Sequence, residues 1–381
     1  MKQGALTGVK VLDLSRLLPG PYCSMILSDH GATVISIEDE RFKDEAAFPT
    51  LVNRNKSHMT LNLKTDEGRK IFYKMVEDSD IVMEGFRPGV VDKLKIDYKT
   101  ISKINPGIIY CSITGYGQTG AYANRPGHDV NYLGVSGVLD LIGEKGNPPA
   151  IPGIQIADIA GGSMNAVIGI LLALQARHTT GRGQYIDISM TDGALSLLHL
   201  ALDFQQMTGQ VAEKSDSILS HRYAFYNTYE TKDGRHLTIG ALEFRFWKQL
   251  CEFLGKPEYI KLQYDEIQRE AIIDDLRATF KAKTLAEWKE ELGDLDVCWS
   301  PVNSIPDVLE SPLFKEREMI VDIEDKNGYK TQSIGIPVKL SDTPGGIKSA
   351  PVEFGSSTEN VLLELGYTSE EISDFRKNNI I

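Results

Sequence analysis

Short apolar segments alternate with helical segments through the first 200 residues of this 381-residue chain. The predicted strands are Val9–Leu14, Thr33–Ile37, Ile81–Met83, Ile108–Ile113 and Tyr185–Ile188. Short apolar strands separated by helices are typical of a parallel sheet that is covered on both faces. The alternation therefore predicts an α/β fold built on a doubly wound, mostly parallel, Rossmann-like sheet.

The pattern changes near residue 220, where the chain becomes richer in helices. The predicted elements there are the strand His236–Ala241 and the helices Phe246–Leu254, Ile267–Phe280 and Leu285–Leu292. Strand-like segments return at Met319–Ile323 and Ser333–Leu340, and the last helix opens at Thr368 and Glu371 with a capping-box pattern. A chain of this length usually forms two or three domains. We expect a large α/β domain over residues 1–200 and 310–381, and a smaller α+β domain over residues 220–305.

The composition narrows the class of partner. The formal net charge is 41 − 53 = −12, which argues against nucleic acid or an anionic membrane as the main partner. The four cysteines, at 23, 111, 251 and 298, are too far apart for a metal motif or a disulfide framework. The opening segment does not resemble a secretory signal, and no apolar run approaches the length of a membrane span. We expect a cytoplasmic protein that holds no metal.

A histidine and a carboxylate lie at the two ends of a loop-rich segment, residues 127–162. His128 is near its start, and Asp158 precedes the apolar helical run Met164–Leu174. Asp158 therefore stands like a helix N-cap, where free N–H groups and the helix dipole can stabilise an oxyanion. Two bases on either side of a carbon suit proton transfer next to a carbonyl. The alternative is that Asp158 only caps a helix and His128 belongs to an ordinary loop.

A glycine-rich loop follows the strand that ends near residue 113. Gly115, Gly117 and Gly120 match the letters of the dinucleotide-binding pattern G-x-G-x-x-G. That pattern binds a nicotinamide dinucleotide only where a helix follows at once, and Ala-Tyr-Ala-Asn-Arg-Pro is not helical. We therefore interpret the segment as a loop whose backbone lines a ligand groove.

Four charged residues have two possible roles each. Arg54, Lys56 and Arg87 belong to clusters near strand ends, where they either bind phosphates or contribute ordinary surface charge. Glu243 precedes a predicted helix, where it either caps the helix or orients an imidazole elsewhere.

Five motifs together are similar to the family III CoA-transferase and racemase superfamily. They begin at Ser15 (SRLLPGP), Asn53 (NRNK), Glu84 (EGFRPG), Thr114 (TGYGQTG) and Thr180 (TGRGQ). The resemblance covers nearly the whole chain. Within the superfamily, the segments GHDVNY, IADIAGG and GALE, which contain His128, Asp158 and Glu243, resemble those of the α-methylacyl-CoA racemases.

The resemblance implies a racemase that inverts the α-carbon of 2-methylacyl-CoA thioesters by two-base proton transfer. His128 and Asp158 are then the two bases, Glu243 orients the histidine, and Tyr132 and Gly161 contact the acyl group. The alternative is a CoA-transferase in which Asp158 becomes an acyl anhydride and His128 has no catalytic part. A third possibility is a protein that binds CoA esters without turnover, against which two paired bases argue.

The resemblance also assigns the CoA-binding residues, which are Arg54, Lys56, Arg87, Gly115, Tyr116 and Gly117. CoA is part of the substrate, so no separate cofactor is expected. Relatives usually carry a basic residue near the position of Ser36, and Arg41 is a possible substitute for it. The resemblance further implies an intertwined homodimer.

Overall fold

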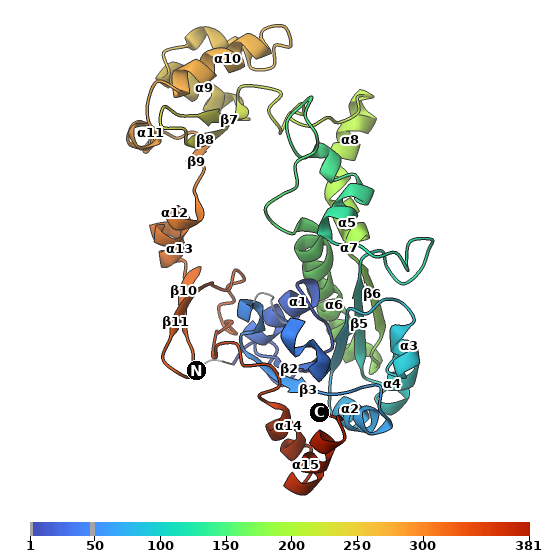
Figure 1. Cartoon of the computed structure of the whole chain (residues 1–381). Helices are drawn as coiled ribbons and strands as arrows, with labels where there is room; N and C mark the ends of the chain where they lie inside the picture. The colour runs from blue at the N-terminus through green and yellow to red at the C-terminus, as the bar shows by residue number, and fades with distance from the viewer. Residues whose placement is uncertain (1–2, 46–49) are drawn as a thin grey trace. The chain divides into compact units, whose positions relative to one another are not determined.

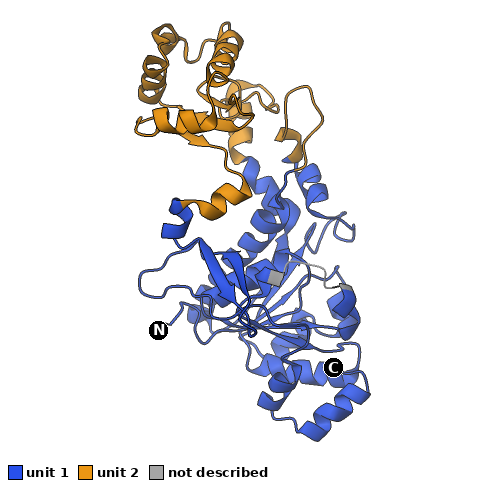
Figure 2. Ribbon diagram, turned by 60° about the vertical axis from the view of Figure 1, so that its left-hand side comes forward, with its two compact units in different colours: residues 1–138, 152–198, 312–381 blue, residues 139–151, 199–311 orange. Residues whose placement is uncertain are grey.

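The computed structural model describes residues 3–45 and 50–381, which divide into two compact units (Figures 1 and 2). Unit 1 contains residues 1–138, 152–198 and 312–381, and unit 2 contains residues 139–151 and 199–311. Residues 139–151 fall inside the predicted large domain but belong to unit 2.

A six-stranded, wholly parallel sheet forms the centre of unit 1. Its strands are β1 (Lys10–Asp13), β2 (Thr33–Glu38), β3 (Lys56–Thr60), β4 (Ile81–Glu84), β5 (Ile109–Thr114) and β6 (Tyr185–Ser189). Their order is β3-β2-β1-β4-β5-β6, with each neighbouring pair parallel. The predicted doubly wound α/β fold is confirmed, and the order reverses between β1 and β4.

Helices cover both faces of this sheet (Figure 1). They are α1 (Pro19–Asp29), α2 (Asp66–Glu77), α3 (Val90–Leu94), α4 (Tyr98–Ile104), α5 (Asp129–Ser136), the π-helix η4 (Ala157–Met164), α6 (Asn165–Thr180) and α7 (Met190–Leu195). Helix α1 packs on α6, and α2 packs on α4. Phe72 of α2 lies in a fully buried core with Leu12, Val82 and Tyr110 of the sheet.

Residues 312–381 return to unit 1 and end in two helices, α14 (Thr358–Glu364) and α15 (Ser369–Lys377). Leu362 and Ile372 of these helices join the same core. The predicted capping box is present, because Thr368 Oγ1 accepts from the N–H of Glu371 and the Glu371 carboxylate accepts from the N–H of Thr368.

Two strands differ from the prediction. Strand β3 was not expected, because Lys-Ser-His-Met-Thr is polar in sequence although four of its five residues are buried. The strand predicted over Ser333–Leu340 is wrong in its bounds. The structure pairs β10 (Ile320–Glu324) with β11 (Lys330–Ile334) and ends β11 before Gly335 and Pro337. Proline has no N–H to continue a ladder.

Unit 2 is a smaller α+β unit. Its antiparallel sheet has the order β7 (Tyr226–Glu230), β8 (His236–Gly240) and β9 (Trp299–Pro301). Its helices are α8 (His199–Thr208), α9 (Phe244–Phe253), α10 (Arg269–Phe280), α11 (Leu285–Leu292) and α12 (Ile305–Glu310); α13 (Pro312–Glu316) follows in unit 1. Its core contains several large aromatic residues, with Trp247, Phe280 and Trp288 all buried.

A long helical run among the described residues has an apolar face that is partly exposed. Helices η4 and α6 form a continuous run, Ala157–Thr180, which by length and composition alone is able to cross a membrane. That is weak evidence, because ordinary core helices pass the same test. Met164, Ile168, Leu171 and Leu172 are exposed at helical spacing along the run, and we call this set the α6 face.

Candidate functional site

The sheet topology places a ligand crevice in unit 1. In open parallel sheets, ligands bind at the carboxyl ends of the strands where the strand order reverses. Here the reversal lies between β1 and β4. The loops that begin there are residues 14–18 after β1, 85–89 after β4 and 115–128 after β5. Three of the five superfamily-like motifs lie in or overlap these loops.

His128 and Asp158 both belong to unit 1 and start two neighbouring helices. His128 is the residue before α5, and its exposed position is fixed by its N–H, which donates to Asn131 Oδ1 at 3.0 Å. Asp158 is not the N-cap that the sequence predicts. The N-cap of η4 is Ile156, and Asp158 lies in the first turn with a half-buried side chain.

The electrostatics link these two residues. The pKa of Asp158 is raised to about 6, mainly by burial and also by the negative charge of Asp129. The charge of His128 acts in the opposite direction, so the imidazole lies close enough to stabilise the carboxylate. A carboxyl group with a pKa near neutrality can accept and return a proton at physiological pH.

Asp129 is a site residue that the sequence analysis missed. Its Oδ1 accepts the backbone N–H of Asp158 at 3.0 Å, which ties the start of α5 to the start of η4. Two carboxylates near each other disfavour double ionisation, and this accounts for part of the raised pKa of Asp158. Its place directly after His128 was the only signal in the sequence.

The predicted oxyanion donors are only partly available. The N–H of Asp158 is bound by Asp129, and the N–H of Ile159 donates to the carbonyl of Gln155 at 3.1 Å. The prediction that the first N–H groups of this helix hold the enolate oxygen therefore does not apply to these two groups.

A tyrosine closes one side of the site. Tyr132 of α5 is buried and donates its hydroxyl to the carbonyl of Gly127 at 2.5 Å. Its ring lies so close to Gly115 and Gly127 that a Cβ at either position would fall 2.4 or 2.7 Å from it. Both glycines are thus required by the ring. Burial raises the pKa of Tyr132 to about 12, and the charge of Asp158 adds to that rise.

Gly161 has a packing role in this structure. A Cβ there would lie 2.5 Å from the carbonyl oxygen of Met190, so the glycine lets η4 approach α7 closely. The wider π-turn is held by two side chains. Ser163 Oγ donates to the carbonyl of Asp158 at 3.0 Å, and Asn165 Nδ2 donates to that of Gly161 at 3.0 Å. Such π-turns frequently occur at functional sites. Contact between Gly161 and substrate stays a prediction.

The glycine-rich loop after β5 does not lead into a helix. The next helix is α5, which begins at Asp129. Gly117 has φ +78°, and the following N–H of Gln118 donates to the Asp187 carboxylate of β6 at 3.0 Å. The ring of Tyr116 packs edge-on against Tyr132 with the centroids 5.2 Å apart. The loop therefore lines the site beside Tyr132, and its contact with CoA stays a prediction.

Arg54 lies inside unit 1. Its guanidinium forms an ion pair with Asp29 at 2.6 Å and also donates to Ser333 Oγ at 3.1 Å. Arg54 and Asp29 are 2 and 3% exposed. This arrangement fastens residues 333–334 to the end of α1, which indicates a structural role instead of a phosphate contact.

Lys56 is also buried. Its Nζ donates to the carbonyl of Pro21 at 2.8 Å and lies 4.0 Å from the carboxylate of Asp13. Burial lowers the pKa of this lysine to about 8, and Asp13 opposes the change. A fully enclosed ammonium group bound to protein oxygens is poorly placed to contact CoA directly.

Arg87 is the exposed cation of the predicted set. It lies in the loop after β4, at the carboxyl ends of the strands, and its charge lowers the pKa of Tyr132. A small apolar slot of about 50 Å³ lies at the ends of β1 to β4, with Leu14, Phe86 and Arg41 among its lining residues. Arg41 contacts the ring of Phe42, 4.4 Å from its centroid.

Glu243 belongs to unit 2, where it is the N-cap residue of α9. Its exposed side chain does not cap the helix and forms no hydrogen bond or ion pair with any residue in the described ranges. Helix capping, one of the two roles that the sequence suggests for Glu243, is therefore wrong. Its action on His128 stays a prediction.

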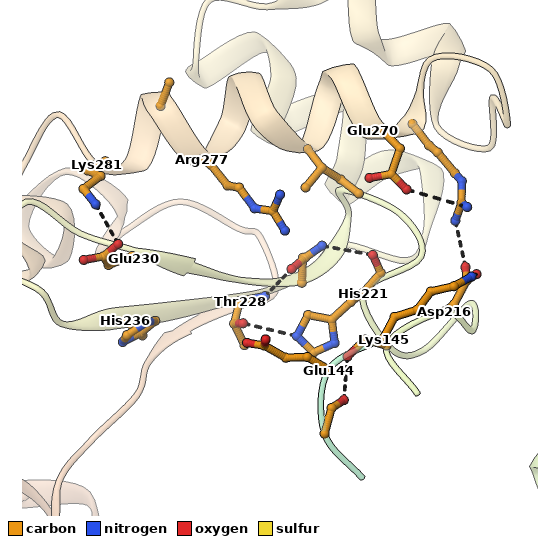
Figure 3. A pocket seen from close by; sticks show the side chains of 16 residues that line it. Glu144, Lys145, Asp216, His221, Thr228, Glu230, His236, Glu270, Arg277 and Lys281 are labelled. Carbon is orange, nitrogen blue, oxygen red and sulfur yellow. Dashed lines mark hydrogen bonds and ion pairs between the residues drawn. The ribbon is translucent and has the colours of Figure 1, made fainter. Parts of the chain in front are cut away.

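A second cavity, of about 950 Å³, lies wholly within unit 2 and contains none of the predicted site residues. Its charges pair with one another. Lys281 forms an ion pair with Glu230 at 2.7 Å, and Arg269 with Asp216 at 2.8 Å (Figure 3). The described residues contain no cluster of three His, Cys, Asp or Glu side chains that is able to hold a metal. We therefore place the candidate site in unit 1.

Comparisons with known proteins find relatives that match nearly the whole chain. Human α-methylacyl-CoA racemase is 33% identical over 99% of this chain and 97% of its own length. Succinyl-CoA:mesaconate CoA-transferase of Haloarcula marismortui is 34% identical over 90% of this chain and 92% of its own. The crystal structure of a CAIB/BAIF family protein from Brucella suis superimposes with a TM-score of 0.84 at 29% identity, covering 96% of this chain and 100% of that one.

The family match extends over most of the chain. Residues 6–358 match CoA-transferase family III. These residues include the whole site built around His128 and Asp158 and leave out only residues 1–5 and 359–381. The chain therefore belongs to CoA-transferase family III, whose relatives include both racemases and CoA-transferases.

Proposed function

We propose that this enzyme is a racemase of 2-methylacyl-CoA thioesters. The observation that carries the proposal is the electrostatic pairing of an imidazole, His128, with a carboxyl group whose pKa lies near 6, Asp158. A racemase needs two groups that each accept and donate a proton near neutral pH. A nucleophile that forms an acyl anhydride needs only the carboxylate.

The reaction follows from this pair. One base removes the α-proton, and the electron pair of the C–H bond forms the double bond of an enolate whose charge rests on the thioester oxygen. The other group, in its acid form, then returns a proton to the opposite face of the α-carbon. The centre is inverted, and each base ends in the protonation state from which the reverse reaction starts. Exchange of these protons with water restores the enzyme.

The second candidate is transfer of CoA between carboxylic acids. Relatives of similar identity are CoA-transferases, and Asp158 has the half-buried carboxylate that such a nucleophile requires. In that reaction Asp158 attacks the thioester carbonyl and releases CoA as a thiolate. His128 then has no step of its own.

For the CoA part of the substrate, we assign Arg87 and the slot lined by Arg41 and Phe86. Both arginines are exposed, whereas Arg54 and Lys56 are enclosed. Arg41 stacks on Phe42 and pairs with Asp39 at 3.4 Å, and its exposed guanidinium beside the slot suits a phosphate group of CoA.

We also propose a homodimer in the cytoplasm. The support for the dimer is the α6 face, a stripe of exposed apolar residues. Contact of these residues with water is unfavourable, and a second copy of the chain would cover them. Replacing Ile168 with Asp is expected to give a monomer in sedimentation velocity. An unchanged dimer would contradict the assignment of this face, and recovery of the wild-type chain with vesicles would point to a lipid surface.

The test of the activity is proton NMR in deuterated water with an enantiopure 2-methylacyl-CoA, with and without a free carboxylic acid. A racemase is expected to remove the α-proton signal and produce both enantiomers without any acceptor. A new acyl-CoA that appears only when the acceptor is added would establish the transferase instead.

A further inference from the structure

A carboxyl group outside the reacting pair lies buried at the end of β4. Glu84 is the last residue of that strand and is 1% exposed. Among the described residues, Glu84 forms no hydrogen bond or ion pair with His128 or Asp158. Within residues 3–45 and 50–381 it has no cationic partner within 4 Å. A buried carboxyl group without such a partner is costly, so its presence at this position calls for a reason.

Two hydrogen bonds occupy its two oxygens. Oε2 accepts the backbone N–H of Phe86 at 2.7 Å, and Oε1 accepts the hydroxyl of Ser112 on the neighbouring strand β5. Ser112 Oγ in turn accepts the hydroxyl of Tyr185 on β6 at 3.0 Å. Glu84 therefore ties the loop that begins at residue 85 to three adjacent strands of the sheet.

The loop fastened in this way carries two candidate CoA contacts. Phe86 lines the apolar slot beside Arg41, and Arg87 acts electrostatically on Tyr132. The hydrogen bond to Glu84 is donated by the backbone N–H of Phe86, so it holds the loop at the residue directly before Arg87. The next backbone bond, from the N–H of Val90 to the carbonyl of Arg87 at 3.1 Å, only closes the loop on itself.

The protonation state of Glu84 does not decide this arrangement. Burial raises its pKa to about 7, while the bonds from Ser112 and Phe86 oppose the rise. In the acid form one oxygen still accepts the N–H of Phe86, and a hydroxyl group can be shared with Ser112. A glutamine offers the same carbonyl and a donor, so it is the conservative replacement.

We propose that Glu84 is a positioning residue that holds Phe86 and Arg87 in the orientation that binds CoA. The proposal rests on the proposed function, in that CoA is taken as part of the substrate. Glu84 touches no reacting atom. Its loss is therefore expected to weaken CoA binding without slowing the chemical step.

The experiment compares Glu84→Met with Glu84→Gln in the full chain. Methionine has a similar volume but cannot accept the N–H of Phe86. We expect E84M to raise the Kd for free CoA in calorimetry, and the KM for acyl-CoA, at least about 10-fold, with kcat within about threefold of the wild type. E84Q is expected to restore both constants to within about threefold. A merely structural role would lower kcat and the folded fraction together and give no such split.

Ser79→Ala is the matched control, since Ser79 is a buried hydroxyl just before the other end of β4 and is expected to leave the Kd unchanged. If E84M does not fold, Glu84→Asp keeps a carboxyl group but shortens its reach, and is expected to raise the Kd. A wild-type Kd in a folded E84M or E84D would overturn the inference alone. Failure of the wild-type enzyme to bind CoA would overturn it together with the CoA assignment.

Discussion

Two clusters of charged residues in unit 1 were both predicted from the sequence to take part in function, and they differ in structure. At Arg54, a guanidinium is enclosed and bound to the carboxylate of Asp29. At Asp158, a half-buried carboxyl group lies beside a second carboxylate, Asp129, and an exposed imidazole, His128. The first cluster pairs each charge with a partner, and the second leaves its carboxyl group near its titration point.

The difference separates stability from reactivity. An ion pair whose hydrogen bonds are already made inside the protein gains little free energy from contact with a ligand. A carboxyl group whose pKa is raised by burial and by a neighbouring negative charge is ready to exchange a proton near neutral pH. We therefore expect changes at the first cluster to act on folding and changes at the second to act on turnover.

The largest effect is expected from Asp158→Ala. Removal of this carboxyl group eliminates a base of the racemase and also the nucleophile of a transferase. We expect turnover to fall by about 10⁴-fold, the upper range for loss of a general acid–base group. The measurement is the initial rate with 2-methylacyl-CoA, with thermal unfolding as the control. Loss of activity accompanied by an equal loss of folded protein would contradict a catalytic role for Asp158.

His128→Ala is expected to lower the rate of inversion by about 10² to 10³-fold. The exposed side chain contributes little packing, so the free energy of unfolding is expected to stay within about 0.5 kcal/mol of the wild type. Chiral separation of the products gives the rate. Inversion at the wild-type rate would remove His128 from the mechanism and favour the transferase.

Arg54→Met acts on the other cluster. It leaves the carboxylate of Asp29 buried without its cation, which is expected to cost about 3–5 kcal/mol in the free energy of unfolding. Urea denaturation measures this loss. The folded fraction is expected to keep the wild-type Kd for CoA, whereas Arg87→Met is expected to show the opposite pattern, with stability unchanged and CoA binding weakened. A stable R54M with weak CoA binding would reverse the roles assigned to the two arginines.

The smallest effect is expected from Asp129→Asn. Asparagine keeps the oxygen that accepts the N–H of Asp158 but removes the negative charge that raises the pKa of that carboxyl group. The pKa of Asp158 therefore falls, and the carboxylate persists to lower pH. We expect the acid limb of the kcat/KM profile to move to lower pH. A shift toward higher pH would contradict the electrostatic account.

Much of the fold was predictable because apolar periodicity reports burial. The five predicted strands of the sheet are present, but β3 was missed because Lys56 and His58 are buried with polar partners. Sequence could not distinguish an enclosed cation such as Arg54 from an exposed one such as Arg87, since the partners Asp29 and Ser333 lie far along the chain.

The sequence picked out two residues of the candidate site, and their catalytic roles stay predictions, but it missed several details of the geometry. His128 and Asp158 lie at the starts of two helices, α5 and η4, that a hydrogen bond from Asp158 to Asp129 joins, and a linear pattern can suggest such helix starts. The N-cap interpretation of Asp158 was wrong because η4 begins earlier, at Ala157. The role of Asp129 depends on one hydrogen bond across 29 residues, which no local pattern reports.

The most direct test of the two-base claim is α-proton exchange in deuterated water by the two single-base variants, each given one enantiomer of 2-methylacyl-CoA at a time. H128A retains the base on one face and D158A the base on the other. We predict that each variant exchanges the α-proton of only one enantiomer, without inversion, and that the two variants select opposite enantiomers. Exchange of the same enantiomer by both variants would contradict the account.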